Sequence, residues 1–401
     1  MSLHETHEPS HLMMHSPAAA PSPGLLDRVL AVAAGRGCSD VHVSADAAPV
    51  NRLNGSLAPM PEFPEAISQA QLLDELLAIM SATQREEFRT QGEVDLSHTV
   101  EGAGRFRVNV FRQLGSVAAA FRLIASRAFT LEELGAPAIA RELALRPRGL
   151  VLVTGPTGSG KSTTLAAMID IINREKSGHI ITVEDPIEFV HTSRSSLVHQ
   201  REVGSDTHSF AEALRRILRQ DPDVILIGEL RDPESISTAL TAAETGHLVL
   251  TTLHTQGASK SINRIVDAFP AHQQDQVRSQ LGDTLQGVIS QTLVPTAQGD
   301  GRVIATEVLV STPAVANLIR ENQIPQLYNA MQAGAAHGMH TLDQSLKDLV
   351  ARGRVAPGLA RHYLTDPRAL DDVRVQVPDF DAETWLSHGA QHQAAAEDWK
   401  Y

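Results

Sequence analysis

The sequence predicts an α/β protein in which a small α+β domain precedes a larger domain built on a parallel β-sheet. Three observations indicate this fold class. Apolar and polar residues alternate strictly over 104–112, as in a half-buried strand. Four short apolar runs from residue 150 onward are each followed by polar loop residues, as in sheets whose strands alternate with helices. The first of these runs leads into a glycine-rich loop and then a helix.

Composition narrows the class of protein further. The 401 residues include 34 Lys and Arg, 47 Asp and Glu, and a single cysteine, and the formal net charge is -13. The negative balance argues against a protein that coats nucleic acid, because phosphates are bound mainly by Lys and Arg. One cysteine excludes an intramolecular disulfide and a cysteine-based zinc site. Neither a secretion signal nor an apolar run of roughly 20 residues is visible, so we expect a cytoplasmic protein.

The two ends of the chain differ from the middle. Residues 1–24 contain four histidines and four prolines but no Lys or Arg. We expect a disordered extension there rather than a metal site, because the histidine spacing is irregular. Residues 371–401 are rich in Asp, Glu, Gln and Ala, which predicts an acidic, flexible tail. Between them we expect the small domain over 25–125 and the larger domain, ending in helices, over 126–370.

The small domain is predicted to contain a helix from residue 25, a strand at 40–44, a helix at 69–80, and strands at 104–112 and 116–124. Its arginines lie mostly on the polar faces of the last two strands. A solvated surface is the simplest interpretation. The alternative is that an arginine acts on the triphosphate of a neighbouring subunit. The residues alone leave both open for Arg105, Arg107, Arg112 and Arg122.

A phosphate-binding loop is the strongest motif in the chain. Residues 155–162 read GPTGSGKS and match G-x-x-x-x-G-K-[ST] between a strand and a helix. Glycines let backbone N–H groups surround phosphate oxygens, and the helix N-terminus favours the negative charge. Lys161 is expected to reach the β- and γ-phosphates, and Ser162 to bind Mg²⁺. The predicted ATP site comprises Gly155, Pro156, Thr157, Gly158, Ser159, Gly160, Lys161, Ser162 and Thr163.

Acidic residues follow two other predicted strands. The strand at 224–227 leads to Glu229, where a carboxylate would hold Mg²⁺ directly or through water. The strand at 180–183 leads to Glu184, Asp185 and Glu188, one of which would orient and deprotonate the attacking water. Since the carboxyl ends of parallel strands meet at one edge of a sheet, we expect these groups beside the phosphate loop.

Two histidines bracket the strand predicted at 248–252. His247 and His254 are seven residues apart, which places their side chains on opposite faces of an extended strand and argues against a shared metal. A γ-phosphate sensor or a subunit contact suits them better. A structural role for either histidine stays open on the residues alone.

Several motifs together carry a family resemblance. From about Ser39 to Val355 the sequence resembles the type IV pilus retraction ATPases of the PilT family, within the secretion-ATPase superfamily of hexameric motors. The resemblance implies a PAS-like N-terminal domain joined by a flexible linker to a RecA-like P-loop ATPase domain. It also implies a ring of six subunits with nucleotide between the two domains. The matching stretches are 104–109, 148–168 (Walker A), 181–191 (Asp box), 212–232 (Walker B) and 240–255 (His box).

The resemblance also implies roles and partners. Glu188 takes the position of the catalytic base, and Glu229 that of the Walker B residue governing Mg²⁺ and water. His247 and His254 occupy the His-box positions. Arg107 and Arg122 match small-domain arginines that face the nucleotide. The implied partner is the inner-membrane platform protein of the pilus, with the pilins affected only indirectly, so the motor would sit at the inner face of the cytoplasmic membrane.

Within the superfamily, three features favour retraction over assembly. Related assembly ATPases carry a tetracysteine zinc site and a long extra N-terminal domain, and this chain has one cysteine and a short segment there. Residues 314–321 read AVANLIRE, close to a C-terminal signature of the family, with Ala316 in place of Arg. The alternatives are a related motor for type II or type IV secretion, an accessory retraction motor, a nucleic-acid motor and a non-catalytic ATP-binding scaffold. We expect no direct contact with nucleic acid.

Overall fold

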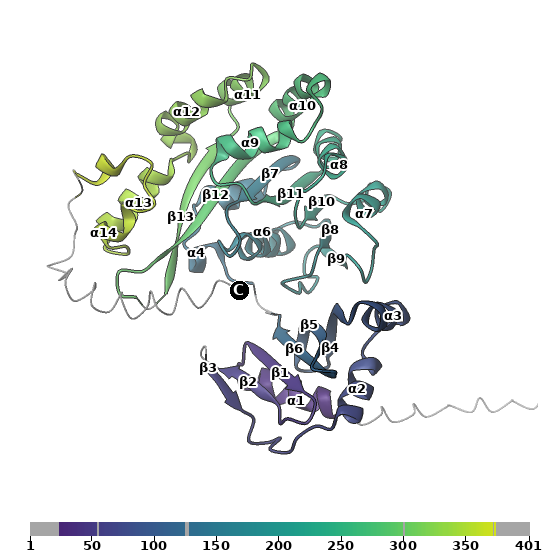
Figure 1. The fold of residues 1–401 in the computed structure, drawn as a ribbon. Coiled ribbons are helices and arrows are strands. Elements are labelled where there is room, and N and C mark those ends of the chain that lie inside the picture. Colours follow the sequence, from purple (N-terminus) through teal and green to yellow (C-terminus); the bar gives the residue numbers. More distant parts are fainter. Residues whose placement is uncertain (1–23, 54–55, 125–127, 300, 372, 374–401) are drawn as a thin grey trace, which may run out of the picture. The chain divides into compact units, whose positions relative to one another are not determined.

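The computed structural model describes residues 24–53, 56–124, 128–299, 301–371 and 373. The extension predicted at 1–24 and the tail predicted at 371–401 therefore lie outside the described residues, apart from Gly24, Asp371 and Val373. Internal contacts divide the chain into two units, Met1–Leu123 and Ile124–Tyr401. Figure 1 shows the helices and strands of both units.

The N-terminal unit is a six-stranded antiparallel sheet with the strand order β3-β2-β1-β6-β5-β4. The alternation predicted for 104–112 is confirmed, because Phe106, Val108 and Val110 are buried and Arg107 is exposed. The elements are α1 (Leu25–Gly35), β1 (Asp40–Ser44), β2 (Val50–Leu53), β3 (Ser56–Pro59), α2 (Gln69–Ala78), α3 (Ala82–Gln91), β4 (Glu93–Val100), β5 (Gly104–Gln113) and β6 (Ser116–Leu123).

The C-terminal unit is built on a seven-stranded sheet with the order β13-β12-β7-β11-β10-β8-β9. Every neighbouring pair from β12 to β9 is parallel, and β13 pairs antiparallel with β12. The predicted α/β class is therefore confirmed. The strands are β7 (Gly149–Thr154), β8 (His179–Glu184), β9 (Leu197–Glu202), β10 (Val224–Ile227), β11 (Leu248–Leu253), β12 (Leu285–Pro295) and β13 (Arg302–Val310).

Helices cover both faces of this sheet (Figure 1). The chain moves outward from β7 to β8 through α6 and then returns through α7 and α8, so right-handed crossovers place α6 on the face opposite α7 and α8. The helices are α4 (Leu131–Leu134), α5 (Ile139–Ala144), α6 (Lys161–Glu175), α7 (Phe210–Ile217), α8 (Pro233–Glu244), α9 (Ala258–Asp267), α10 (Ala271–Thr284), α11 (Pro313–Arg320), α12 (Leu327–Ala333), α13 (Leu342–Ala351) and α14 (Pro357–Ala360), with 3₁₀ turns η1 (Ile324–Gln326), η2 (Ala335–His337) and η3 (Pro367–Leu370).

The strands at the centre of the sheet are mainly apolar. In β7 the run Leu150–Val153 is completely buried, as is most of β10 and β11, because helices cover both faces of these strands. The predicted helical character of 312–352 is confirmed, and Val315 and Ile319 of α11 point into the core. Among the described residues, no helix combines the length and the apolarity needed to cross a membrane.

Candidate active site

Four loops meet along one edge of the larger sheet. Strands β7, β11, β10 and β8 are parallel and paired in register near their carboxyl ends, as in Thr154 with Leu253 and Val183 with Ile227. The chain leaves these ends as the loop 155–160, His254, Glu229 and the acidic segment 184–188. Ligands bind outside the carboxyl ends of strands in open α/β sheets, so this edge is the candidate site.

Glycine shapes the loop after β7. Gly155 has φ +141°, and a Cβ atom there would lie 2.2 Å from the carbonyl oxygen of Gln291. Gly160 has φ +85° and immediately precedes α6, which begins without a side-chain cap. The N–H groups of the first turn of α6 are therefore available to an anion, and the helix dipole favours negative charge there.

Lys161 is hydrogen-bonded to the start of this loop. Its ammonium is largely buried and donates hydrogen bonds to the carbonyl oxygens of Gly155 at 3.0 Å and Pro156 at 2.9 Å. Burial lowers the pKa of Lys161, while the negative charges of Glu188 and Glu229 act in the opposite direction. Carboxyl groups from two different loops thus face the lysine that begins α6.

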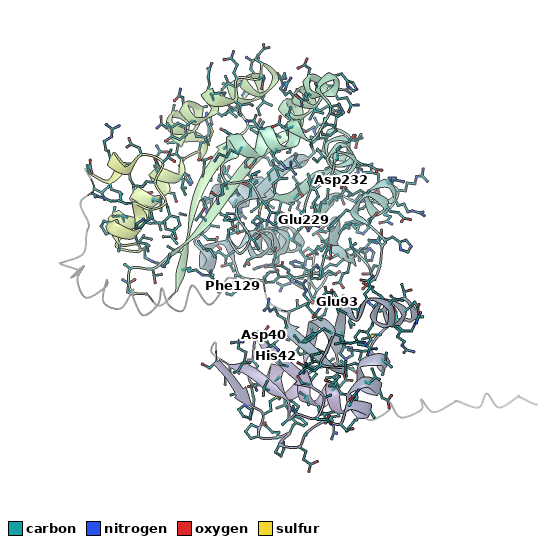
Figure 2. The ribbon with its side chains drawn as sticks, in the orientation of Figure 1. Asp40, His42, Glu93, Phe129, Glu229 and Asp232 are labelled. Carbon is teal, nitrogen blue, oxygen red and sulfur yellow. The ribbon has the colours of Figure 1, made fainter. Side chains whose placement is uncertain are left out.

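His254 joins the carboxylate after β10 to the phosphate loop. Its Nε2 lies 3.3 Å from Oε2 of Glu229, and its Nδ1 lies 3.4 Å from Oγ1 of Thr157. Glu229 is only 13% exposed and also pairs with Arg231. Figure 2 shows Glu229 near Asp232, which caps α8 by accepting a hydrogen bond from the backbone N–H of Ser235 at 2.9 Å. The start of α8 therefore fixes the segment that carries Glu229 and Arg231.

Two of the three carboxyl groups in the acidic segment 184–188 lie in different surroundings. Oε1 of Glu184 accepts hydrogen bonds from Oγ1 of Thr182 at 2.6 Å and from Nε2 of Gln200 at 3.3 Å. Burial of this carboxyl group raises the pKa of Glu184 to about 7. Glu188 is exposed, and its charge acts on both Glu184 and Lys161. One carboxyl group is therefore enclosed by the sheet edge while the other lies open toward the loop.

His247 does not join this group. It lies before the first residue of β11, where its backbone carbonyl accepts a hydrogen bond from the N–H of Gly149 at the start of β7. The phosphate loop follows the other end of β7. At about 3.3 Å per residue, the two histidines are on the order of 20 Å apart along the strand. Nδ1 of His247 is 2.9 Å from the carbonyl oxygen of Ala242.

The two predicted arginines form a cross-strand pair in the N-terminal unit. Arg107 of β5 lies directly opposite Arg122 of β6, and Asp40 of β1 lies on the other side of Arg122. Nε of Arg122 donates a hydrogen bond to Oδ1 of Asp40 at 2.8 Å. The side chain of Arg122 remains 71% exposed, whereas that of Asp40 is 13% exposed. Asp40 thus holds one end of an arginine whose guanidinium points into solvent.

Sequence reasoning missed a residue that supports the loop. Gln291 of β12 is 1% exposed, and its amide bonds to the backbone of Ser159 and to the hydroxyl of Thr164. A polar residue inside the apolar run of 285–294 was the available signal, but no strand was predicted there. Among the described residues, no group of three or more His, Cys, Asp or Glu side chains is arranged to hold a metal ion.

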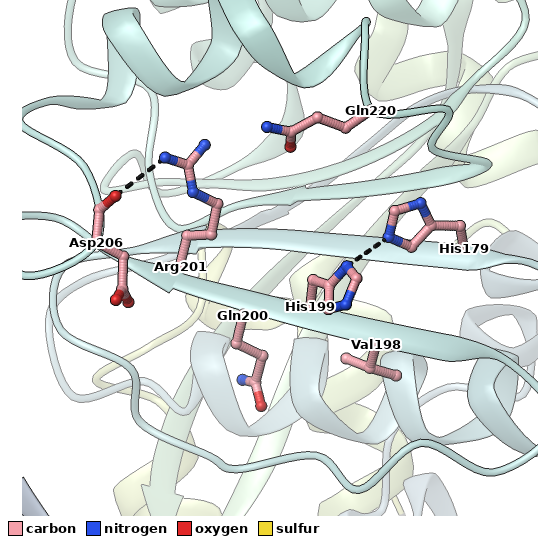
Figure 3. A pocket seen from close by; sticks show the side chains of 7 residues that line it. All are labelled: His179, Val198, His199, Gln200, Arg201, Asp206 and Gln220. Atoms are coloured by element: carbon pink, nitrogen blue, oxygen red, sulfur yellow. Dashed lines mark hydrogen bonds between the residues drawn. The ribbon is translucent and has the colours of Figure 1, made fainter. Parts of the chain in front are cut away.

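A separate depression of about 550 Å³ lies along the edge strand β9 (Figure 3). Nδ1 of His199 is 2.9 Å from Nε2 of His179, and Arg201 donates to the carbonyl oxygen of Asp206 at 3.0 Å. The depression shares no residue with the phosphate loop. It is lined by His179, Val198, His199, Gln200, Arg201, Asp206 and Gln220.

The chain is similar to known proteins over most of its length. The chain is 52% identical over 342 residues to the type IV pilus retraction ATPase PilT of Pseudomonas aeruginosa, covering 85% of this chain and 98% of that protein. It is 53% identical over 313 residues to a twitching motility protein of Neisseria gonorrhoeae, covering 78% of this chain and 83% of that protein. A crystal structure of the pilus retraction motor PilT with bound ADP superimposes with a TM-score of 0.79 at 48% identity, covering 87% of this chain and 99% of that one. Residues 17–363 match the family described as type II/IV secretion system protein, and the chain belongs to that family.

Proposed function

We propose that this protein is an ATPase motor that powers the retraction of type IV pili, and with it twitching motility. The observation that carries the proposal is the meeting of Lys161, Glu188, Glu229 and His254 at one sheet edge, in a chain 52% identical to a pilus retraction ATPase. The phosphate loop supplies the nucleotide site, and the acidic loops supply the groups that turnover needs.

Binding of ATP would change the hydrogen-bond partners of the Lys161 ammonium. Its ammonium now donates to two loop carbonyls, and the β- and γ-phosphate oxygens are stronger acceptors because they are charged. The N–H groups at the start of α6 would take the remaining phosphate oxygens. The triphosphate is therefore expected to replace the loop carbonyls as the acceptor for Lys161. It would be held by that ammonium and by the N–H groups at the start of α6.

The donor set suits Mg²⁺, which prefers oxygen ligands and retains several waters. Ser162 would bind it directly. Glu229 would act through a water, because its two carboxylate oxygens are already engaged by Arg231 and His254. When bound, Mg²⁺ neutralises charge on the β- and γ-phosphates.

Glu188 is the proposed general base. An exposed carboxylate that faces Lys161 is placed to accept a proton from a water attacking the γ-phosphorus. The oxygen–phosphorus bond forms on one side of the γ-phosphorus while the bond to the β–γ bridging oxygen breaks on the other. ADP leaves with the electron pair of that bond, and the proton stays on Glu188. His254, between Thr157 and Glu229, is placed to register whether the γ-phosphate is present.

The working assembly is proposed to be a ring of six copies. Arg107 and Arg122 would then reach the triphosphate of a neighbouring copy, as their exposed cross-strand pairing allows. His247, at the opposite sheet edge, would serve a contact between copies. The partner that receives the motion would be the inner-membrane platform protein, with pilins returned to the membrane and the motor on its cytoplasmic face. Direct binding to nucleic acid is not part of the proposal.

The experiment that tests the proposal is a pilus count on native cells lacking this gene, complemented with wild type or with Lys161→Ala. We expect many static pili and no twitching, with rescue by wild type alone. Cells without pili would indicate an assembly motor instead. Unchanged pili would favour a secretion motor or an accessory retraction motor.

A further inference from the structure

We propose that Gln291 is a positioning residue that sets the shape of the phosphate loop from the neighbouring strand, an inference that rests on the proposed nucleotide site. Its amide is fully enclosed and makes two hydrogen bonds. Nε2 donates to the carbonyl oxygen of Ser159 at 2.7 Å, and Oε1 accepts from Oγ1 of Thr164 at 3.0 Å. One side chain from β12 thus connects the loop to the first turn of α6.

The backbone around Gln291 follows the loop closely as well. A Cβ atom at Gly155 would lie 2.2 Å from the carbonyl oxygen of Gln291, and one at Gly160 would lie 3.3 Å from its Nε2. Gly155 and Gly160 begin and end the loop. Glycine at these two positions therefore also lets β12 and its glutamine approach the whole loop, beyond the positive φ that each residue adopts.

The bond to Ser159 has a directional consequence. In a trans peptide the C=O and the following N–H point in opposite directions. Because Gln291 holds the Ser159 carbonyl toward β12, the N–H of Gly160 points away from β12. That N–H belongs to the turn that precedes α6, where an anion would bind. Gln291 thereby presets a phosphate donor without touching the nucleotide.

An amide is the side chain that suits this place. It donates and accepts at once, which neither a carboxylate nor a thioether does. Removing it leaves two buried polar groups, the Ser159 carbonyl and the Thr164 hydroxyl, without their partner, and such groups are costly to bury alone. The loop would then turn toward other partners and lose the arrangement that nucleotide binding needs.

The test compares ADP and ATP affinities of the purified full chain with Gln291→Met and with the matched control Gln286→Met. Gln286 lies on the same strand, but beside Gly149 at the start of β7 rather than beside the loop. We expect Gln291→Met to weaken nucleotide binding by about tenfold or more, given the loss of two hydrogen bonds, and the control to bind like wild type. Circular dichroism and thermal unfolding establish that each variant is folded. Equal affinities for Gln291→Met and wild type would overturn the inference.

A second variant keeps the test decisive if Gln291→Met does not fold. Gln291→Glu retains an acceptor for Thr164, but when ionised it places a carboxylate against the Ser159 carbonyl. A protonated carboxyl group regains the donor, so ADP affinity relative to wild type should rise as the pH falls from about 8 to about 6. If the ADP affinities of Gln291→Glu and wild type change with pH in the same way, the side chain at 291 only fills space and the inference is wrong. Failure of wild type and control alike to bind nucleotide would instead overturn the proposed site itself.

Discussion

Nε2 of His254 lies 3.3 Å from Oε2 of Glu229, and the other nitrogen of the same ring lies 3.4 Å from Oγ1 of Thr157. The histidine thus connects the carboxylate that would govern Mg²⁺ to the loop that would hold the phosphates. A change at Glu229 or at Thr157 is therefore expected to alter the tautomer and the orientation of the His254 ring.

His254→Ala is therefore expected to separate binding from turnover. The loop and Lys161 remain, so ADP affinity should change little, while kcat for ATP should fall by about 10²-fold with the loss of a positioned polar group. His272→Ala, at an exposed position of α10, is the matched control and should retain wild-type kcat. A loss of ADP affinity as large as the loss of kcat would contradict a sensing role.

Glu184 gives the protein an unusual pH dependence. Burial raises the pKa of Glu184 from 4.5 to about 7. Between pH 4.5 and pH 7 this carboxyl group is therefore protonated in the folded protein but ionised in the unfolded chain. Stability contributed by that proton is present at acidic pH and is lost as the pH rises toward 7. Glu184→Gln mimics the protonated form. Its free energy of unfolding relative to wild type should therefore rise by about 1–3 kcal/mol between pH 5.5 and pH 8.

The measurement is urea unfolding of both proteins across that pH range. Glu244→Gln, at an exposed position of α8, supplies the control, and its difference from wild type should not vary with pH. A difference between Glu184→Gln and wild type that does not vary with pH would mean that Glu184 is ionised throughout this range.

If Arg122 acts on the triphosphate bound by a neighbouring subunit, two variants that are each nearly inactive should regain ATPase activity when they are mixed in one ring. Arg122→Ala keeps an intact phosphate loop, and Lys161→Ala keeps an intact arginine. In rings mixed at equal amounts, a site formed from the loop of the first and the arginine of the second is complete, so activity should return to about one quarter of wild type. Each variant alone should retain only a small residual activity. No recovery after mixing would place Arg122 outside the neighbour's site.

Asp40 is expected to act on catalysis through Arg122. Burial would raise the pKa of Asp40, but hydrogen bonds from Arg122 and Ser39 outweigh it and hold the pKa below its usual range. Figure 2 labels Asp40 beside His42 on β1. Asp40→Asn weakens the hold on Arg122 and should lower kcat by about tenfold with little change in KM. In the Arg122→Ala background the same substitution should not lower the residual kcat further, and an additive loss would contradict the coupling.

Much of the site followed from local pattern. The loop 155–162, its flanking strand and helix, and the carboxylates after β8 and β10 are predictable because buried strands and phosphate loops have strong signals of their own. The register of four parallel strands then brings Glu188, Glu229 and His254 to one edge.

The remaining parts depend on tertiary contacts that periodicity does not reveal. The strands β12 and β13 were not predicted, although they extend the sheet, and Gln291 could not be linked to a loop more than 130 residues earlier. His247 and His254 were expected to bracket a strand, and they lie just before and just after β11. The edge strand β9 was missed because its few apolar residues do not alternate with polar ones. Strand β4 was missed although Val94, Leu96 and Val100 alternate with polar residues.

ATP turnover by the purified chain, compared between wild type and Glu188→Gln, tests the central claim most directly. Glutamine keeps the size of the side chain and removes the base, so ADP and ATP should bind as in wild type while hydrolysis falls by about 10²-fold or more. Lys161→Ala, measured alongside, should lose binding itself. Turnover by Glu188→Gln at the wild-type rate would contradict the account, because Glu188 would then not be the general base.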